Sequence, residues 1–167
     1  MKREKPEHLL VVHHKGVGPN EKLPISLIKH VIRTTLKHEG VNMQCEIGVR
    51  IVNDIMMRER NREYRGVDKT TDVLSFPLYE FSKPGWGGLL REEICSGEEV
   101  LPLGDIVMSA EQIIRQASEN NQTYEYETAY ITSHSVLHLL GYDHVDEGED
   151  KKLMRKKEKE IMQKIGL

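Results

Sequence analysis

Cysteine is scarce in this sequence, and so are the patterns in which cysteine does chemistry. The chain of 167 residues has two cysteines, Cys45 and Cys95, and neither belongs to a C-x-x-C pair. Such pairs are typical of thiolate zinc sites and redox motifs, and small secreted scaffolds need several disulfides. The two cysteines allow one disulfide at most, and in a cytosolic setting we favour two free thiols.

Long apolar runs and glycine-rich phosphate loops are also missing. No apolar run approaches the roughly 18 residues of a membrane-spanning helix, and residues 1–7 lack the apolar core of a secretory signal. We therefore expect a cytoplasmic protein without membrane contact. Neither G-x-G-x-x-G nor G-x-x-x-x-G-K follows a predicted strand, which argues against a doubly wound nucleotide-binding fold. The length predicts one domain over residues 1–167 with a single core.

An excess of positive charge is absent as well. The net charge is −3, whereas most nucleic-acid-binding domains are basic. A local basic patch can still suffice, because net charge does not fix the charge of one face. The C-terminal segment from Lys151 to Lys164 is rich in lysine, but acidic residues precede it from Asp146 to Asp150. That order complements a helix dipole, and we interpret the segment as a solvated helix face.

Hydrophobic periodicity predicts alternating strands and helices. Apolar residues alternate over 45–52, as in a strand, and recur at helical spacing over 24–38, with Gly40 as a stop. The other predicted elements are strands over 8–14, 72–77 and 103–108, and helices over 54–65, 109–120 and 123–140, with a last helix beginning near 146–149. This order predicts an α/β (α+β-like) domain, a small mixed β-sheet surrounded by helices.

The stretch 79–102 holds six of the glycines and prolines and is the expected insertion between elements. It contains the only tryptophan, Trp86. An exposed Trp86 can stack on a nucleic-acid base. Since tryptophan more often covers a core, we favour that role.

Three histidines near the C-terminal end carry the most specific chemical signal. His134, His138 and His144 stand with Gly141 in the spacing H-x-x-x-H-x-x-G-x-x-H. Residues four apart share one face of a helix, and a glycine lets the chain turn back after it. Three imidazoles then converge on one point and leave an open fourth position, as in catalytic zinc sites. We predict one zinc-type ion on this helix, although imidazole ligands also accept nickel or copper.

The general base of the related protease motif is missing. Metzincin proteases have glutamate directly after the first histidine, and this chain has Ser135. A serine hydroxyl does not accept a proton from metal-activated water at neutral pH. Phosphodiester cleavage in RNA is still possible, because the 2′-hydroxyl is a built-in nucleophile and a metal polarises a phosphoryl oxygen.

An arginine-rich helix offers phosphate contacts. Arg58, Arg62 and Arg65 lie on one stripe of the predicted helix 54–65, and guanidinium groups bind phosphate in a bidentate manner. For Arg58 and Arg62 we favour an ordinary solvated face with nearby glutamates as partners. Arg65 differs, because it stands beside Gly66 at the helix end, ahead of a predicted strand.

These blocks together resemble the YbeY family of bacterial metal-dependent endoribonucleases and rRNA maturation factors. The resemblance rests on Tyr64-Arg65-Gly66, on the stretches 71–77 (TDVLSFP) and 103–107 (LGDIV), and on the histidine block, and it covers nearly the whole chain. It implies that His134, His138 and His144 bind the metal and that Arg65 contacts RNA or acts in catalysis. The family usually has glycine where this chain has Ser135, a change that concerns local packing more than activity.

The resemblance implies a single-strand-specific, zinc-dependent endoribonuclease in rRNA processing, namely 16S rRNA 3′ end maturation and ribosome quality control on the small ribosomal subunit. The residues leave two alternatives open: a metallopeptidase-like hydrolase, and a non-catalytic ribosome-assembly factor with a structural metal. No general base is identifiable. Asp72, Asp105 or Asp143 is a candidate to accept the second N–H of a histidine, as groups around metal sites usually do, and Asp143 could equally cap the turn beside His144.

Overall fold

In a computed structural model, which describes residues 7–90, 99–143 and 148–167, a four-stranded mixed sheet forms the centre of the chain. The strand order is β1-β2-β4-β3. The first three strands run parallel, and β3 pairs antiparallel with β4. The strands are β1 (Leu9–Lys15), β2 (Cys45–Val52), β3 (Val73–Pro77) and β4 (Leu101–Ser109). The predicted small mixed sheet is therefore confirmed.

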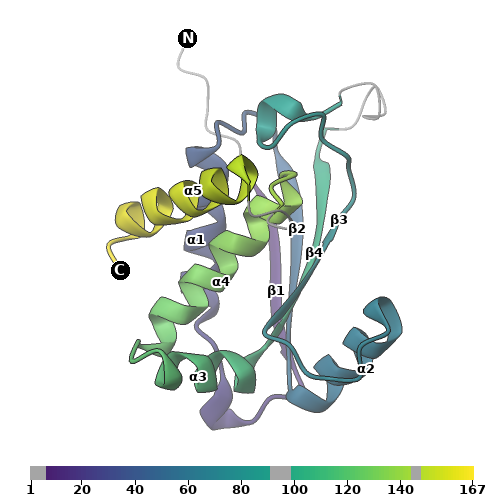
Figure 1. The fold of residues 1–167 in the computed structure, drawn as a ribbon, viewed down its shortest axis with the longest axis vertical. Helices are drawn as coiled ribbons and strands as arrows, with labels where there is room; N and C mark the ends of the chain where they lie inside the picture. The colour runs from purple at the N-terminus through teal and green to yellow at the C-terminus, as the bar shows by residue number, and fades with distance from the viewer. Residues whose placement is uncertain (1–6, 91–98, 144–147) are drawn as a thin grey trace.

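Helices cover the two faces of the sheet unequally. Figure 1 shows α1, α3, α4 and α5 on one side of the sheet, with α2 alone on the other. The helices are α1 (Ile25–His38), α2 (Asp54–Arg65), α3 (Ala110–Glu119), α4 (Tyr124–Leu139) and α5 (Glu149–Ile165), and two short 3-10 turns lie at Pro19–Glu21 and Trp86–Gly88. No helix in the described ranges is both long and apolar enough to cross a membrane.

Local signals set the helix ends close to their predicted positions. The Asn53 side chain accepts a hydrogen bond from Met56 N (2.9 Å), and α2 ends at Gly66 in the left-handed conformation. Strand β4 begins two residues earlier than predicted, because Pro102 is accommodated at a bulge. There Glu46 pairs with Pro102 and Ile47 with Gly104, so the proline needs no regular place in the hydrogen-bonded ladder.

The main core lies between the sheet and the helical layer. Helix α4 runs through this layer and buries residues on several faces, including Val136, Leu137 and Leu139. Trp86 packs against the same core, and its Nε1 donates to Asn42 Oδ1 (3.1 Å), so its core-covering role is confirmed. Cys45 is a buried free thiol whose pKa burial raises to about 12. Cys95 lies outside the described residues.

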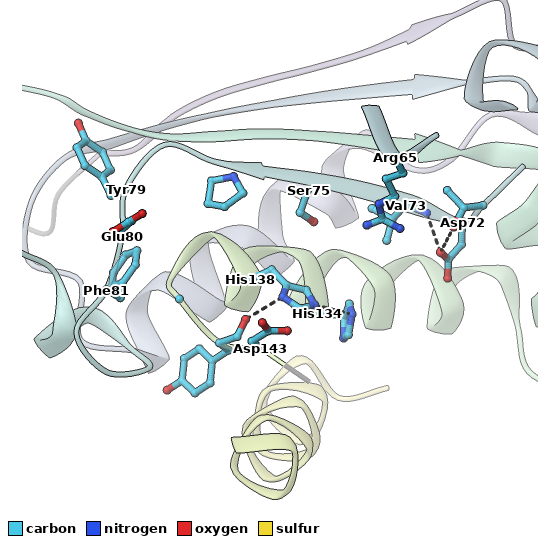
Figure 2. Close-up of a pocket in the computed structure, with 14 residues that line it drawn as sticks. Arg65, Asp72, Val73, Ser75, Tyr79, Glu80, Phe81, His134, His138 and Asp143 are labelled. Carbon is cyan, nitrogen blue, oxygen red and sulfur yellow. Dashed lines mark hydrogen bonds between the residues drawn. The ribbon is translucent and has the colours of Figure 1, made fainter. Parts of the chain in front are cut away.

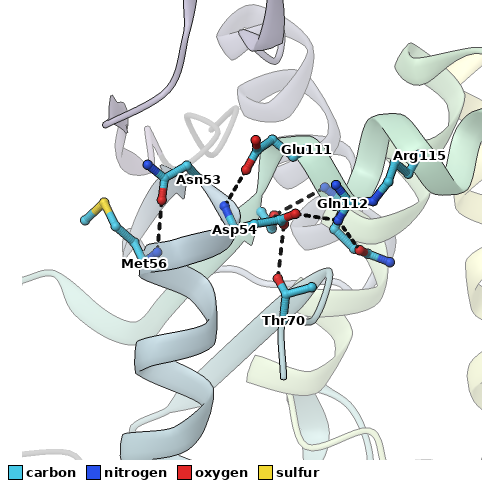
Figure 3. A network of polar contacts seen from close by, with 8 residues as sticks. Asn53, Asp54, Met56, Thr70, Glu111, Gln112 and Arg115 are labelled. Atoms are coloured by element: carbon cyan, nitrogen blue, oxygen red, sulfur yellow. Dashed lines mark hydrogen bonds and ion pairs between the residues drawn. The ribbon is translucent and has the colours of Figure 1, made fainter. Parts of the chain in front are cut away.

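A polar network fixes the start of α2 to the segment that follows it. Asp54 accepts hydrogen bonds from Thr70 Oγ1 (3.1 Å) and Ser109 Oγ (2.7 Å), and Arg115 Nη2 bonds the same carboxylate (Figure 3). Burial acts to raise the pKa of Asp54, but these hydrogen bonds and the Arg115 charge outweigh it and lower the pKa. The contacts tie the chain between Arg65 and β3 to the base of the sheet.

Candidate metal and phosphate site

Two of the predicted metal ligands lie on one face of α4. Thr123 begins the helix by accepting from Tyr126 N (3.1 Å), which leaves His134 and His138 one turn apart near its C-terminal end. Their ring centroids are 4.6 Å apart and their planes are nearly perpendicular. Both rings are half-buried. The predicted shared face is therefore present.

The end of α4 is a Schellman turn that also contacts the site. Gly141 N donates to His138 O (3.0 Å), and Tyr142 N donates to Leu137 O (3.1 Å). Gly141 has a φ of 85°, and an added Cβ there would lie 2.5 Å from Phe81. The turn brings the carbonyl oxygen of Tyr142 to within 2.8 Å of His138 Nδ1. The glycine of the motif thus ends the helix and places an acceptor for one of its histidines.

Hydrogen bonds orient both imidazoles in the same way. His138 Nδ1 faces the Tyr142 carbonyl, and His134 Nδ1 lies 2.6 Å from Glu158 Oε1. A carbonyl and a carboxylate are acceptors, so they favour the hydrogen on Nδ1 of each ring. The Nε2 atoms then present lone pairs, and they face one another at 3.1 Å. Two facing lone pairs at this distance favour a cation between them.

The nitrogen spacing suits a tetrahedral metal. Two nitrogens held about 2.0–2.1 Å from one zinc lie roughly 3.3–3.4 Å apart, which is close to the observed 3.1 Å. His144, the third predicted ligand, lies outside the described residues. Within the part of the chain that the structure describes, no group of three or more His, Cys, Asp or Glu side chains is placed to hold a metal. The two predicted ligands that the structure describes, His134 and His138, are spaced as an imidazole-bound ion requires.

The groups that orient the histidines differ from those expected. Glu158 on α5 and the Tyr142 carbonyl take the role predicted for an aspartate. Asp72 instead accepts from Val73 N (2.8 Å), and the exposed Asp105 lines a separate groove. Asp143 lines the cleft beside the histidines. Neither Asp72 nor Asp105 is therefore the Nδ1 partner of His134 or His138, and for His144, outside the described residues, the prediction stays a prediction.

Glu158 is held by a second partner. Its side chain is 6% exposed, and Tyr130 Oη donates to its Oε2 at 3.2 Å. Burial and the neighbouring Glu158 charge raise the pKa of Tyr130 to about 12, so the phenol keeps its proton at neutral pH. Sequence analysis missed Glu158, because it lies 24 residues after His134 in the chain. Only the packing of α5 against α4 brings the two side chains together.

Arg65 lines the same cleft as His134 and His138. The cleft has a volume of about 630 Å³, with β3 and the end of α2 on one wall and α4 on the other. Figure 2 shows Arg65 and Ser75 on the sheet side of the cleft, opposite His134 and His138. The cleft therefore combines a guanidinium group with two imidazoles over one open space.

The other two arginines of α2 behave as the solvated interpretation predicted. Arg58 forms two hydrogen bonds of 2.9 Å with Asp68, and Arg62 lies 3.9 Å from the same carboxylate. Their partner is Asp68 rather than the glutamates of the helix. Both arginines are exposed and neither lines the cleft.

Ser135 turns away from the cleft. It is fully buried, and its hydroxyl donates to the carbonyl oxygen of Ile131 (2.8 Å), one turn earlier in α4. The serine is accommodated without an unsatisfied polar group. Its side chain offers no base where metzincins carry glutamate.

Comparisons with known proteins place the chain in one family. Residues 15–166 match the family model described as "Endoribonuclease YbeY". Proteins named Endoribonuclease YbeY are 46% identical in Thermoanaerobacter sp. (strain X514), covering 84% of this chain and 87% of the relative, and 42% identical in Clostridium beijerinckii, covering 90% and 92%. The solution structure of TM1509 from Thermotoga maritima matches with a TM-score of 0.58 and 25% identity, covering 94% of this chain and 89% of that one. The chain belongs to the YbeY family.

Proposed function

We propose that this protein is a metal-dependent endoribonuclease whose cleft holds one zinc ion on His134, His138 and His144. The observation that carries the proposal is the pair of Nε2 atoms facing one another at 3.1 Å, with both Nδ1 atoms hydrogen-bonded, in the cleft that Arg65 also lines. The name shared by the relatives supports the reaction class. A bound divalent cation supplies Lewis-acid polarisation of a phosphate oxygen.

The residues of the chain divide the remaining tasks. Glu158 and the Tyr142 carbonyl hold the two imidazoles in the orientation that exposes Nε2 to the cleft. Arg65 binds the phosphate next to the scissile bond, and its positive charge offsets the charge that develops at phosphorus. The 2′-hydroxyl of RNA is the nucleophile, and none of these residues is assigned as its general base.

The finer proposal concerns the substrate and setting. We infer that the enzyme cuts single-stranded RNA and matures the 3′ end of 16S rRNA on the small ribosomal subunit in the cytoplasm, with residues 1–167 acting as one domain. Membership of the YbeY family supports this assignment. Incubating the protein with single-stranded RNA and with casein, each with and without a chelator, tests the reaction. We expect the protein to cleave the RNA, the chelator to stop this cleavage, and casein to remain intact in both conditions.

Other outcomes would replace the proposal. Chelator-sensitive cleavage of casein alone would indicate the metallopeptidase. A protein that cuts neither substrate and unfolds in chelator would indicate an assembly factor with a structural metal.

Replacing Arg65 by alanine should lower RNA cleavage while leaving metal binding intact. A charge-assisted contact with phosphate contributes about 1.5–3 kcal/mol, so we expect kcat/KM to fall roughly 10- to 100-fold. Arg62→Ala is the matched control, since Arg62 lies on the same helix but outside the cleft. Metal content by elemental analysis should match wild type in both variants. Unchanged cleavage by Arg65→Ala would remove Arg65 from the site.

Replacing Glu158 by glutamine should weaken metal binding. The amide keeps an acceptor for His134 Nδ1 but loses the charge that makes the imidazole a better ligand, and changes to such partners typically cost 10–100-fold in affinity. We expect about a tenfold higher zinc dissociation constant in a competition assay with a chelating dye. Glu160→Gln is the control, because Glu160 pairs with His38 (3.0 Å) on the same helix. Equal zinc affinity of both variants would contradict the orienting role.

A further inference from the structure

Helix α4 carries a continuous stripe of rings that extends beyond the two histidines. Tyr126, Tyr130, His134 and His138 follow one another at four-residue intervals. Tyr130 stacks on His134 with 6.2 Å between ring centroids, and His134 meets His138 edge to face. Each four-residue step turns about 40° around the helix, so the stripe winds out of the cleft toward α5.

The outer part of this stripe lines a groove between α4 and α5, called here the α4–α5 groove. It consists of two adjoining hollows. One, of about 130 Å³, is lined by His134, Tyr130 and Arg155, and the other, of about 420 Å³, by Tyr126, Tyr130, Arg155 and Lys159. His134 lines both the cleft and the smaller hollow, so the groove adjoins the cleft at this residue. Figure 1 shows α5 crossing over α4.

The groove carries positive charge that the described protein does not neutralise. Arg155 and Lys159 are exposed, and neither forms an ion pair with another described residue. Lys152 and Lys156 on the same helix, by contrast, approach Glu149 (3.3 Å) and Glu160 (3.9 Å). The acidic residue in the groove, Glu158, is buried and bonded to Tyr130 and His134. Two basic side chains that pair with no described carboxylate thus lie beside two partly buried tyrosine rings.

We propose that the α4–α5 groove binds the single-stranded RNA that leaves the metal site, with bases against Tyr126 and Tyr130 and phosphates on Arg155 and Lys159. Proteins bind single strands by this combination of stacking rings and a basic track. Tyr126 and His134 are eight residues apart, about 12 Å along the helix, which spans three to four stacked nucleotides at roughly 3.4 Å each. The proposal rests on the proposed function.

The test compares two double variants that are matched in chemistry. Y126L/K159Q removes a ring and a charge from the groove, and Y124L/K156Q removes the same groups from the same two helices outside it. Binding of a labelled single-stranded RNA of about twelve nucleotides is measured in chelator, so that no cleavage occurs. We expect Y126L/K159Q to bind about 10- to 100-fold more weakly, and the control within twofold of wild type. Cleavage of a fragment of about three nucleotides should be unchanged in both.

A second measurement separates phosphate contact from any effect on folding. K159Q alone changes one exposed side chain, and it should reduce the slope of log affinity against log salt by about 0.7, the value for one phosphate contact on a single strand. The proposal would be overturned if Y126L/K159Q bound RNA as tightly as wild type and K159Q kept the wild-type salt slope, or if the control Y124L/K156Q were weakened equally. The groove would then serve a partner other than RNA. If the wild-type protein does not cleave RNA when metal is present, the proposed function is overturned. The binding measurements in chelator would still test the groove in that case.

Discussion

His138→Ala is expected to abolish metal binding and RNA cleavage together. The variant removes one of two nitrogens that face each other at 3.1 Å, and the remaining His134 keeps its contacts with Glu158 and Tyr130 but loses the facing Nε2. Losing a direct ligand should cost more than the 10–100-fold in affinity that an outer partner costs. Because the metal contributes several kcal/mol to stabilising charge at phosphorus, we expect cleavage to fall at least about 1000-fold.

Elemental analysis and an RNA-cleavage assay on the same preparation measure both effects. His30→Ala is the control, since His30 is an exposed histidine on α1 and lies outside the cleft. The control should keep its metal and its activity. His138→Ala removes no side chain from the buried core, so urea unfolding in chelator should give nearly the wild-type stability. A His138→Ala protein that holds one metal per chain and cuts RNA at the wild-type rate would refute the site.

Sequence patterns predicted the parts of this site that are local in the chain. The spacing of His134 and His138 predicts a shared helix face, and Gly141 predicts the turn that ends the helix. Asn53 and Gly66 mark the two ends of α2, which places Arg65 in its last turn. Each of these signals depends on backbone geometry within one or two helical turns, and such geometry can be derived without knowing the tertiary structure.

Contacts between distant segments were beyond the sequence patterns. The three aspartates considered as partners of the histidines stand close to recognisable motifs, whereas Glu158 is one of many charged residues on a basic, outwardly polar helix. Only the packing of α5 against α4 buries it beside His134. Likewise, nothing local shows that Asp68, beyond the end of α2, is the partner of Arg58 and Arg62. Side-chain partners of this kind follow from the packing of elements, which periodicity does not determine.

The tyrosines of α4 show a third kind of omission. Tyr126 and Tyr130 continue the four-residue interval of the histidines, so the pattern was present in the sequence. Alone, it is equally consistent with a stripe of core-covering rings. In the structure both rings are partly buried against the core, and the feature that supports RNA binding as well is the position of Arg155 and Lys159, which line the same groove and form no ion pair with another described residue.

Gly141→Ala should destabilise the protein more than Gly40→Ala. At a φ of 85° a non-glycine residue is strained by about 1–2 kcal/mol, and a Cβ 2.5 Å from Phe81 must displace that ring, which adds about 1–3 kcal/mol. We therefore expect the free energy of unfolding to fall by roughly 2–5 kcal/mol. Urea unfolding in chelator measures this change without the contribution of bound metal.

Gly40→Ala is a closely matched control, and it separates strain from crowding. Gly40 follows α1 in the same kind of turn, with its N donating to Lys37 O (3.1 Å) and Val41 N donating to Leu36 O (3.0 Å). Its φ is 72°, but an added Cβ meets nothing within 4 Å. Gly40→Ala should therefore lose only the strain. The turn at Gly141 also holds the Tyr142 carbonyl against His138 Nδ1, so Gly141→Ala should weaken zinc binding whereas Gly40→Ala should not. Equal losses of stability in the two variants would show that Phe81 does not constrain the turn.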